Sequence, residues 1–353
     1  MERLPQDSGA AALARDAGTM LLAGARGTEA DGELARLVRD VHAGGILLFD
    51  RDLPGGGGPR NIVSPDRLAR LTRDLRALAG RPLLLAADQE GGAVARLAPA
   101  LGFPAFPSPA DAAAAGAAAV RAAARGTAEM LFQAGVNVDL APCVDLHCAA
   151  SSAIGARGRS FAADPARVAE AAGIWLDELA ARGVAACLKH FPGHGSAVGD
   201  THEGFVEVTG TWREAELIPY RRLFAEKTVP LAMAAHVFHA GLDPDAPASL
   251  SRKILTDLLR GELGFRGVVV TDDLSMGAIA KRFPLREALR RAVLAGADWL
   301  CLGNNLGTYD PSLVPRAAET LVSLVRDGEL PRERLAASAE RIRALARRFD
   351  PGR

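Results

Sequence analysis

The sequence lacks an excess of charge of either sign and lacks any long apolar run. Its 42 lysines and arginines balance 42 aspartates and glutamates, so the formal net charge at pH 7 is zero. Because attraction to a polyanion needs an excess of positive charge, we expect neither nucleic acid nor a membrane as a partner. No apolar stretch approaches the length that spans a bilayer, and the alanine-rich residues 112–120 predict a packed helix instead.

Cysteine is scarce as well. Four cysteines stand at positions 143, 148, 187 and 301, and none belongs to a C-x-x-C pair. This spacing gives no support to a structural metal site and indicates reduced, mostly buried thiols in a reducing compartment. The first residues, MERLPQDSGAAALARDAG, carry charges throughout and lack the unbroken apolar core of a secretory signal. We therefore expect a cytoplasmic protein.

What the chain does have is a regular alternation of short apolar runs with longer helical patterns. In 353 residues, of which 49% are hydrophobic and 24% charged, eight apolar runs predict strands. They cover residues 20–25, 45–49, 83–88, 136–140, 184–190, 231–236, 268–272 and 298–302. Helical patterns lie between them, including residues 66–79, 112–134, 165–182, 254–264 and 285–295.

This alternation predicts an α/β protein with a single (β/α)8 TIM-type barrel, and an open doubly wound sheet is the alternative. No linker interrupts the pattern, so we expect one domain over residues 1–353, with extra C-terminal helices from about residue 310 to 353 packed on the barrel. The glycine run 55–58 lacks a following Lys-Ser/Thr pair and predicts a flexible insertion rather than a phosphate-binding loop.

Several predicted strands end in an ionisable residue. Asp88 closes the third strand, Lys189 and His190 the fifth, His236 the sixth and Asp272 the seventh. Because the catalytic groups of (β/α)8 barrels gather at the C-terminal ends of the strands, we expect these side chains to share one mouth.

The segment 188–203, LKHFPGHGSAVGDTHE, contains three of the seven histidines and predicts an active-site loop. Asp200 precedes His202 by two residues, a spacing that lets the carboxylate bond one ring nitrogen and support the imidazolium of a general acid/base. Asp272 suits the fixed carboxylate nucleophile of glycoside hydrolysis. We expect its neighbour Asp273 to cap the helix that follows.

Longer motifs carry a resemblance to a known family. KHFPGHG followed by D-T-H, together with AADQEGGAVAR, GRSF, MAAHV and VVVTDDLSM, resembles the bacterial β-N-acetylhexosaminidases of glycoside hydrolase family 3. The likeness runs from about Gly44 to Leu302. It implies a (β/α)8 barrel that removes terminal, non-reducing β-linked N-acetylglucosamine with retention of configuration. Family members of this single-domain kind commonly act on muropeptides in peptidoglycan recycling. We expect a monomer without cofactor or metal that acts on such muropeptides or on chitooligosaccharides.

The resemblance also assigns roles to residues by position. It implies that Asp272 is the nucleophile, that His202 is the general acid/base and that Asp200 is the carboxylate paired with this histidine. The implied sugar contacts are Asp88, Arg96, Arg159, Lys189, His190 and, at the pocket floor, His236. Arg157 competes with Arg159 for one match, and we choose Arg159 because Ser-Phe follows it directly.

Two departures from the family pattern and two alternative reactions stay open. The insertion at residues 53–59 and the sequence Glu203-Gly204-Phe205 depart from the usual family pattern, which leaves the leaving-group preference undetermined. A histidine acid/base would also permit phosphate to replace water as the acceptor, because it does not repel an anion as a carboxylate would. A metal-dependent barrel hydrolase is a weaker alternative, since the early strands lack an H-x-H pair.

Overall fold

The strands form a closed parallel barrel. The structure is a computed structural model that describes residues 6–350. One eight-stranded sheet has the order β11-β10-β9-β8-β5-β2-β1-β12. Its strands are β1 (Leu21–Gly24), β2 (Gly45–Leu47), β5 (Leu84–Ala87), β8 (Val138–Asp139), β9 (Ala185–Phe191), β10 (Leu231–Ala234), β11 (Val268–Thr271) and β12 (Leu300–Leu302). A parallel bridge between Val270 and Trp299 joins the two edge strands, so the predicted barrel is confirmed.

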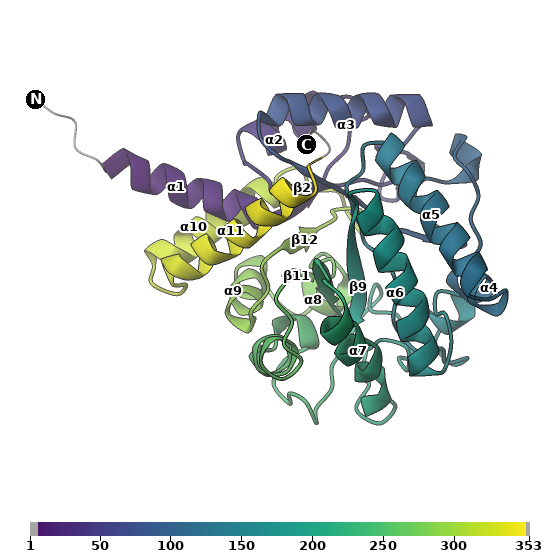
Figure 1. Cartoon of the computed structure of the whole chain (residues 1–353). Coiled ribbons are helices and arrows are strands. Elements are labelled where there is room, and N and C mark those ends of the chain that lie inside the picture. Colours follow the sequence, from purple (N-terminus) through teal and green to yellow (C-terminus); the bar gives the residue numbers. More distant parts are fainter. Residues whose placement is uncertain (1–5, 351–353) are drawn as a thin grey trace, which may run out of the picture.

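Helices surround the barrel (Figure 1). They are α1 (Gln6–Thr19), α2 (Gly32–Arg39), α3 (Pro65–Ala79), α4 (Pro109–Ala114), α5 (Ala117–Gln133), α6 (Pro165–Ala181), α7 (Ile218–Glu226), the π-helix η5 (Lys253–Glu262), α8 (Gly277–Ala280), α9 (Leu285–Ala295), α10 (Leu313–Arg326) and α11 (Arg332–Arg348). Sequence signals explain the bounds of α3, because Ser64 accepts from the N–H of Arg67 and Gly80 ends the helix at φ +60°.

One predicted helix is wrong as drawn. Residues 112–134 were expected to form a single helix, but the chain breaks between α4 and α5. Gly116 stands at the break with φ +99°, a backbone conformation that no helical residue adopts. Alanine on both sides favours helix, and the glycine decides where the two helices separate.

The C-terminal helices pack outside the barrel beside α1. Figure 1 shows α10 and α11 in yellow next to the purple α1, and α1 contacts both of them. Residues 1–5 and 351–353 of the expected single domain lie outside the described residues. In the described part of the chain, no helix is both long and apolar enough to cross a bilayer.

The insertion after β2 is a short hairpin rather than a shapeless loop. Strands β3 (Arg51–Asp52) and β4 (Gly58–Pro59) pair antiparallel, and the four glycines at 55–58 make the turn and begin β4. A second small ribbon, β6 (Gln89–Gly91) with β7 (Val94–Ala95), follows β5. Both ribbons therefore lie at the C-terminal ends of barrel strands, where they add walls to the mouth.

Asp298, just before β12, holds the other end of the barrel together. Its buried carboxylate accepts hydrogen bonds from Arg260 at 2.5 Å, Arg341 at 3.1 Å and the backbone N–H of Val269 at 3.1 Å. The hydroxyl of Ser338 donates to it at 2.7 Å. One carboxylate thus ties β11 and η5 to the C-terminal helix α11.

We expect Asp298→Ala to lower the free energy of unfolding by about 3–5 kcal/mol, because it leaves the buried N–H of Val269, the buried hydroxyl of Ser338 and partly buried guanidinium groups without their acceptor. Urea unfolding followed by circular dichroism measures this loss. The control is Asp257→Ala, whose carboxylate is half exposed and 3.7 Å from Arg252, with an expected loss below about 1 kcal/mol. Equal losses in the two variants would contradict the role of Asp298.

Candidate active site

The predicted site residues gather around one cavity at the C-terminal ends of the strands. Its volume is about 370 Å³. Its lining includes Asp88, Arg96, Arg159, Lys189, His190, Asp200, His202 and Asp272. His236 is the one candidate that does not line it. A larger surface groove at the opposite ends of the strands, near Pro230 and Val268, contains none of these residues.

A buried ion cluster forms the floor of the cavity. Lys189 Nζ donates to Asp88 Oδ1 at 2.8 Å and lies 2.7 Å from Glu90 Oε1. Arg159 grips the same Glu90 with two hydrogen bonds of 2.8 and 2.7 Å. Burial by itself would raise the pKa of Glu90, but Arg159 and Lys189 lower it below its ordinary value. The cluster stays charged and presents fixed hydrogen-bond donors and acceptors to the cavity.

Arg96 stands between two carboxylates nearer the mouth. Its guanidinium lies 3.7 Å from Asp50 and 3.7 Å from Asp88. The side chain is about a third exposed, so it has donors left for a ligand. Asp50 also lines the cavity.

A second buried carboxylate, Asp145, orients His190. Asp145 Oδ2 pairs with His190 Nδ1 at 2.6 Å, and Oδ1 accepts the backbone N–H groups of His190 and His194 at 3.2 and 2.7 Å. Burial would raise the pKa of Asp145, but His190 holds it at about 2. The ring of His190 is therefore fixed, with Nε2 3.4 Å from Arg159.

Cys143, Asp145 and His190 also form the one group within residues 6–350 whose ligand atoms lie close enough for a metal ion. The donor set does not suit a cation. Asp145 already accepts from two backbone N–H groups, and the Arg159 guanidinium lies beside His190. Burial raises the pKa of the Cys143 thiol well above its ordinary range, so the thiolate that binds metals is disfavoured. The geometry instead matches a hydrogen-bonded support for His190.

Asp272 lies directly after β11 and faces the cavity. The backbone N–H of Asp273 donates to its Oδ1 at 2.8 Å, and its own N–H donates to Ala234 O at 2.9 Å. Burial would raise the pKa of Asp272, but the imidazoles of His236, His190 and His202 hold it at about 2. The group is thus a fixed carboxylate that is ionised at neutral pH.

From the sequence we expected Asp273 to cap the next helix, and this prediction is wrong. Helix α8 has Met276 at its N-cap, without a side-chain cap. Asp273 Oδ1 instead accepts from the N–H groups of Ser275 and Gly303, at 2.8 and 3.0 Å. It therefore joins the loops that follow β11 and β12 and braces the peptide next to Asp272.

Asp200 and His202 form a pair at the mouth. Asp200 Oδ1 lies 2.6 Å from His202 Nδ1 and accepts the backbone N–H of His202 at 3.0 Å. Burial would raise the pKa of Asp200, but the N–H groups of His202 and the nearby Arg157 lower it. The side chain of His202 is half exposed, which leaves Nε2 free to face a ligand. Arg157, the competitor of Arg159, lies 3.8 Å from Asp200.

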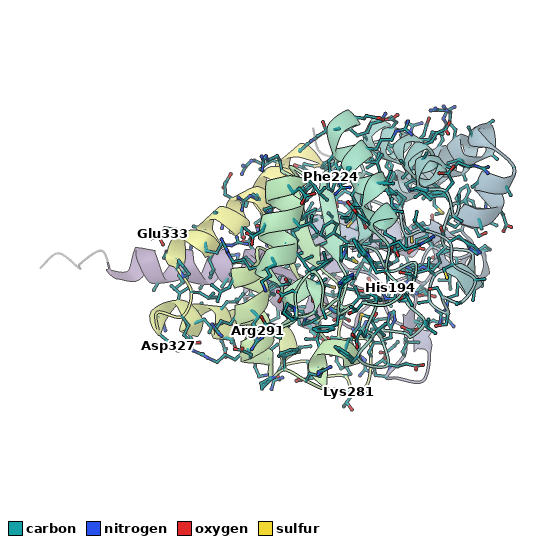
Figure 2. The ribbon with its side chains drawn as sticks, turned by 90° about the horizontal axis from the view of Figure 1, so that it is seen from below. His194, Phe224, Lys281, Arg291, Asp327 and Glu333 are labelled. Atoms are coloured by element: carbon teal, nitrogen blue, oxygen red, sulfur yellow. The ribbon has the colours of Figure 1, made fainter. Side chains whose placement is uncertain are left out.

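The loop that leads to this pair has a rigid base. Figure 2 places His194 inside the ribbon, whereas Lys281, Asp327 and Glu333 lie at the periphery, in agreement with their burial. A Cβ at Gly195 would lie only 2.1 Å from Leu146 O, so this glycine allows a close approach of two backbones.

His236 occupies a supporting position behind Asp272. Its ring is fully buried, with Nδ1 2.7 Å from Ser249 Oγ and Nε2 2.9 Å from Asp273 O. Burial lowers its pKa. Since both nitrogens are occupied, the geometry favours a brace for the Asp272–Asp273 turn over a contact with sugar.

Sequence reasoning gave no role to Glu90, Asp145 or Glu216. Glu90 follows Asp88 by two residues, so the alternation of a strand places both on one face, and this signal was available. Asp145 lies in an irregular segment after β8, and Glu216 lies in the short 3₁₀-helix Glu214–Leu217. Neither position shows in the sequence which loop it contacts.

Comparison with known proteins finds a matching family and relatives that share one description. Residues 15–345 match the model of the glycosyl hydrolase family 3 N terminal domain. A beta-hexosaminidase of Alkalilimnicola ehrlichii is 36% identical over 84% of this chain and 82% of its own length. A beta-hexosaminidase of Tolumonas auensis is 34% identical over 81% of this chain and 83% of its own length.

Solved structures with similar names also superpose on this chain. A glycoside hydrolase family 3 beta-N-acetylglucosaminidase from a Paenibacillus species superposes with a TM-score of 0.88 at 33% identity. That match covers 97% of this chain, which spans 63% of the length of the Paenibacillus protein. A beta-N-acetylhexosaminidase of Beutenbergia cavernae gives a TM-score of 0.81 at 29% identity, over 96% of this chain and 97% of its own.

Glu216 has a buried carboxyl group that makes the stability of the fold depend on pH. Its buried carboxyl accepts from the N–H of Gly195 at 3.1 Å and from the hydroxyl of Ser196, but burial outweighs these bonds and raises its pKa from 4.5 to about 7. The folded protein then keeps a proton that the unfolded chain has released. Its contribution to stability is therefore present below pH 4.5 and is lost as pH rises through 7.

We expect the free energy of unfolding of the wild type, relative to Glu216→Gln, to fall by up to roughly 3 kcal/mol between pH 4.5 and 7.5. Chemical unfolding of both proteins across this range measures the difference. Glu214→Gln is the matched control, because Glu214 stands on the same 3₁₀-helix with a side chain that is mostly exposed. Parallel curves for wild type and Glu216→Gln would show that the carboxyl titrates normally.

Proposed function

The chain belongs to glycosyl hydrolase family 3, and on this premise we propose that it is a retaining exo-β-N-acetylglucosaminidase. The observation that carries the proposal is the pairing of two groups on one cavity. Asp272 is an ionised carboxylate held after β11, and His202 stands at the mouth with Asp200 on its Nδ1. The names of the relatives support the N-acetylglucosaminide as the substrate.

In the proposed first step, Asp272 attacks the anomeric carbon of the terminal sugar while His202 Nε2 gives its proton to the glycosidic oxygen. The bond to the leaving group breaks, and a glycosyl ester of Asp272 forms. In the second step, the neutral His202 takes a proton from water. The oxygen of that water attacks the anomeric carbon and displaces Asp272. This second inversion restores the original configuration, and it leaves Asp272 as a carboxylate and His202 protonated, as at the start.

Asp200 orients and supports His202, the general acid of this proposal. Its carboxylate fixes the tautomer and orientation of His202 and stabilises the imidazolium that holds the proton. A neutral histidine in the second step brings no negative charge next to the ester. The exposed setting of His202 also matches its task, since the glycosidic oxygen lies between the closed end of the cavity and its mouth.

The floor of the cavity holds the terminal sugar in this proposal. Asp88 accepts from two hydroxyls, while Lys189, Arg159 and Arg96 donate to ring substituents and His190 donates or accepts through Nε2. Each of these groups already has a charged partner: Lys189 and Arg96 lie against Asp88, Arg159 against Glu90, and His190 against Asp145. The site is therefore preorganised before a ligand arrives.

The wider biological role is also a proposal. We infer that the substrate comes from peptidoglycan fragments, as muropeptides or chitooligosaccharides, and that a monomer acts in the cytoplasm during cell-wall recycling without a cofactor. The four cysteines are free thiols, which supports a reducing compartment. Phosphorolysis remains the alternative, and product analysis with and without phosphate separates N-acetylglucosamine from its 1-phosphate.

We expect Asp272→Asn to lower kcat on 4-nitrophenyl β-N-acetylglucosaminide by at least about 10³-fold, because the amide cannot form the ester. Release of nitrophenolate measures the rate. Since the pKa of Asp272 lies near 2, the wild-type nucleophile stays ionised well below pH 4, and the acidic side of the rate profile must come from another group. A variant that keeps a near-full rate would refute the assignment.

The acid role of His202 predicts a dependence on the leaving group. Nitrophenolate departs without a proton, whereas an alkoxide of a sugar needs one. We expect His202→Ala to lower kcat/KM for chitobiose by about 10²–10⁴-fold and that for the nitrophenyl glycoside far less. Similar losses on both substrates would indicate that His202 has no role as an acid in the first step.

A further inference from the structure

The part of the chain that carries the acid/base pair lies against the part that follows the nucleophile. Residues 200–205, the acid/base segment, contain Asp200 and His202. Residues 277–282, the α8 segment, consist of α8 and the two cationic residues after it, and the loop that begins at Asp272 leads to them. The α8 segment itself does not line the cavity, so its contacts act on the acid/base segment and not on a ligand.

The backbone of the acid/base residue is bound to the start of α8. The N–H of Gly277 donates to His202 O at 3.1 Å, and that of Ala278 donates to Thr201 O at 3.2 Å. Within residues 6–350, these are the hydrogen bonds that join the main chain of Thr201 and His202 to another part of the protein. The position of the His202 backbone therefore depends on α8.

Gly277 leaves no room for a side chain between the two segments. A Cβ at this position would lie 2.6 Å from Glu203 O and 2.9 Å from His202 O. Both contacts are with backbone atoms, which cannot turn away as the end of a flexible side chain can. Any residue larger than glycine at this position therefore has to displace the backbone of the acid/base segment.

Two cations extend this contact to the next residues of the acid/base segment. Lys281 Nζ donates to Glu203 O at 2.7 Å, and the guanidinium of Arg282 lies over the ring of Phe205, 4.1 Å from its centre. Lys281 stands at the surface of the molecule (Figure 2), and neither cation forms an ion pair within residues 6–350. Glu203 and Phe205 belong to the tripeptide that departs from the usual family pattern, so these two contacts are a feature of this chain.

We propose that Lys281, Arg282 and Gly277 are positioning residues, which hold the acid/base segment so that His202 Nε2 points into the cavity. The inference rests on the proposed function, because it needs His202 to be the acid. The two catalytic groups then keep one geometry relative to each other, since Asp272 and the α8 segment belong to the same connection after β11. Because none of the three positioning residues lines the cavity, their loss affects the delivery of the proton and not the binding of the terminal sugar.

The test compares two substrates with the same terminal sugar that differ in their need for a proton. The sugar that leaves from chitobiose needs one, whereas nitrophenolate does not. We expect Lys281→Met to lower kcat/KM for chitobiose about 5-fold and to change that for the nitrophenyl glycoside by less than about 2-fold. Lys281→Arg keeps a donor and should recover most of the loss. Adding Arg282→Gln to Lys281→Met should bring the loss on chitobiose to about 20-fold.

Gly277→Ala tests the same contact from the backbone side. We expect it to lower kcat/KM for chitobiose by about 10²-fold, and that for the nitrophenyl glycoside far less, because the His202 carbonyl has to move. Its matched control is Gly210→Ala, since a Cβ at Gly210, farther along the same connection as His202, has no atom within 4 Å. This control should leave both rates unchanged. Circular dichroism checks the fold of each variant, and Lys281→Met, a change of an exposed side chain, gives the test a variant that does not depend on packing.

The matched controls for the two cations are Lys253→Met and Arg348→Gln. Lys253 is also exposed and lies 3.5 Å from Asp243, and Arg348 also lies over a ring, 5.2 Å from the centre of Phe349. Neither lines the cavity, so both controls should leave every rate unchanged.

Equal losses on the two substrates in Lys281→Met and Gly277→Ala, or no loss in either variant, overturn the positioning inference while the wild type still hydrolyses both substrates. Failure of the wild type to release N-acetylglucosamine from the nitrophenyl glycoside would instead overturn the proposed function itself, so the two failures are distinguishable.

Discussion

The buried ion cluster of Glu90, Arg159 and Lys189 is the constraint on which the active-site end of the barrel depends. Each of these groups is nearly withdrawn from water, and a buried charge without a partner costs several kcal/mol. Because Glu90 pairs with both cations, and Lys189 pairs with Asp88 as well, none of these groups can move independently. The cluster therefore fixes the ends of β6 and β9 and the loop after β8 relative to one another.

Burial and the number of hydrogen-bond partners decrease outward from this cluster. Asp145 extends it by holding His190 and the backbone of His194, and Asp272 is set against the bracing ring of His236. Toward the mouth the groups become exposed and singly held, as in the Asp200–His202 pair. This division suits a reaction in which one sugar must be bound in a fixed pose while a proton is delivered to an oxygen near solvent.

Much of the fold followed from local patterns. The eight apolar runs are the eight barrel strands, since residues buried on both faces of a parallel sheet must be apolar. The expected family is confirmed by the match over residues 15–345. The alanine-rich helix was drawn without its break, because alanine favours helix and a single glycine such as Gly116 is tolerated in many helices.

The site was predicted where it depends on strand ends and missed where it depends on contacts between loops. By itself the sequence determined the barrel and the strand-end positions of Asp88, Lys189, His190 and Asp272, because periodicity and the order of elements are local properties of the chain. Only the tertiary structure decided that Arg159 is bound to Glu90, that His236 lies behind the cavity, and that Arg60 clamps the hairpin at the mouth. These pairings join residues far apart in the chain, and they depend on how closed loops pack, which no spacing along the sequence records.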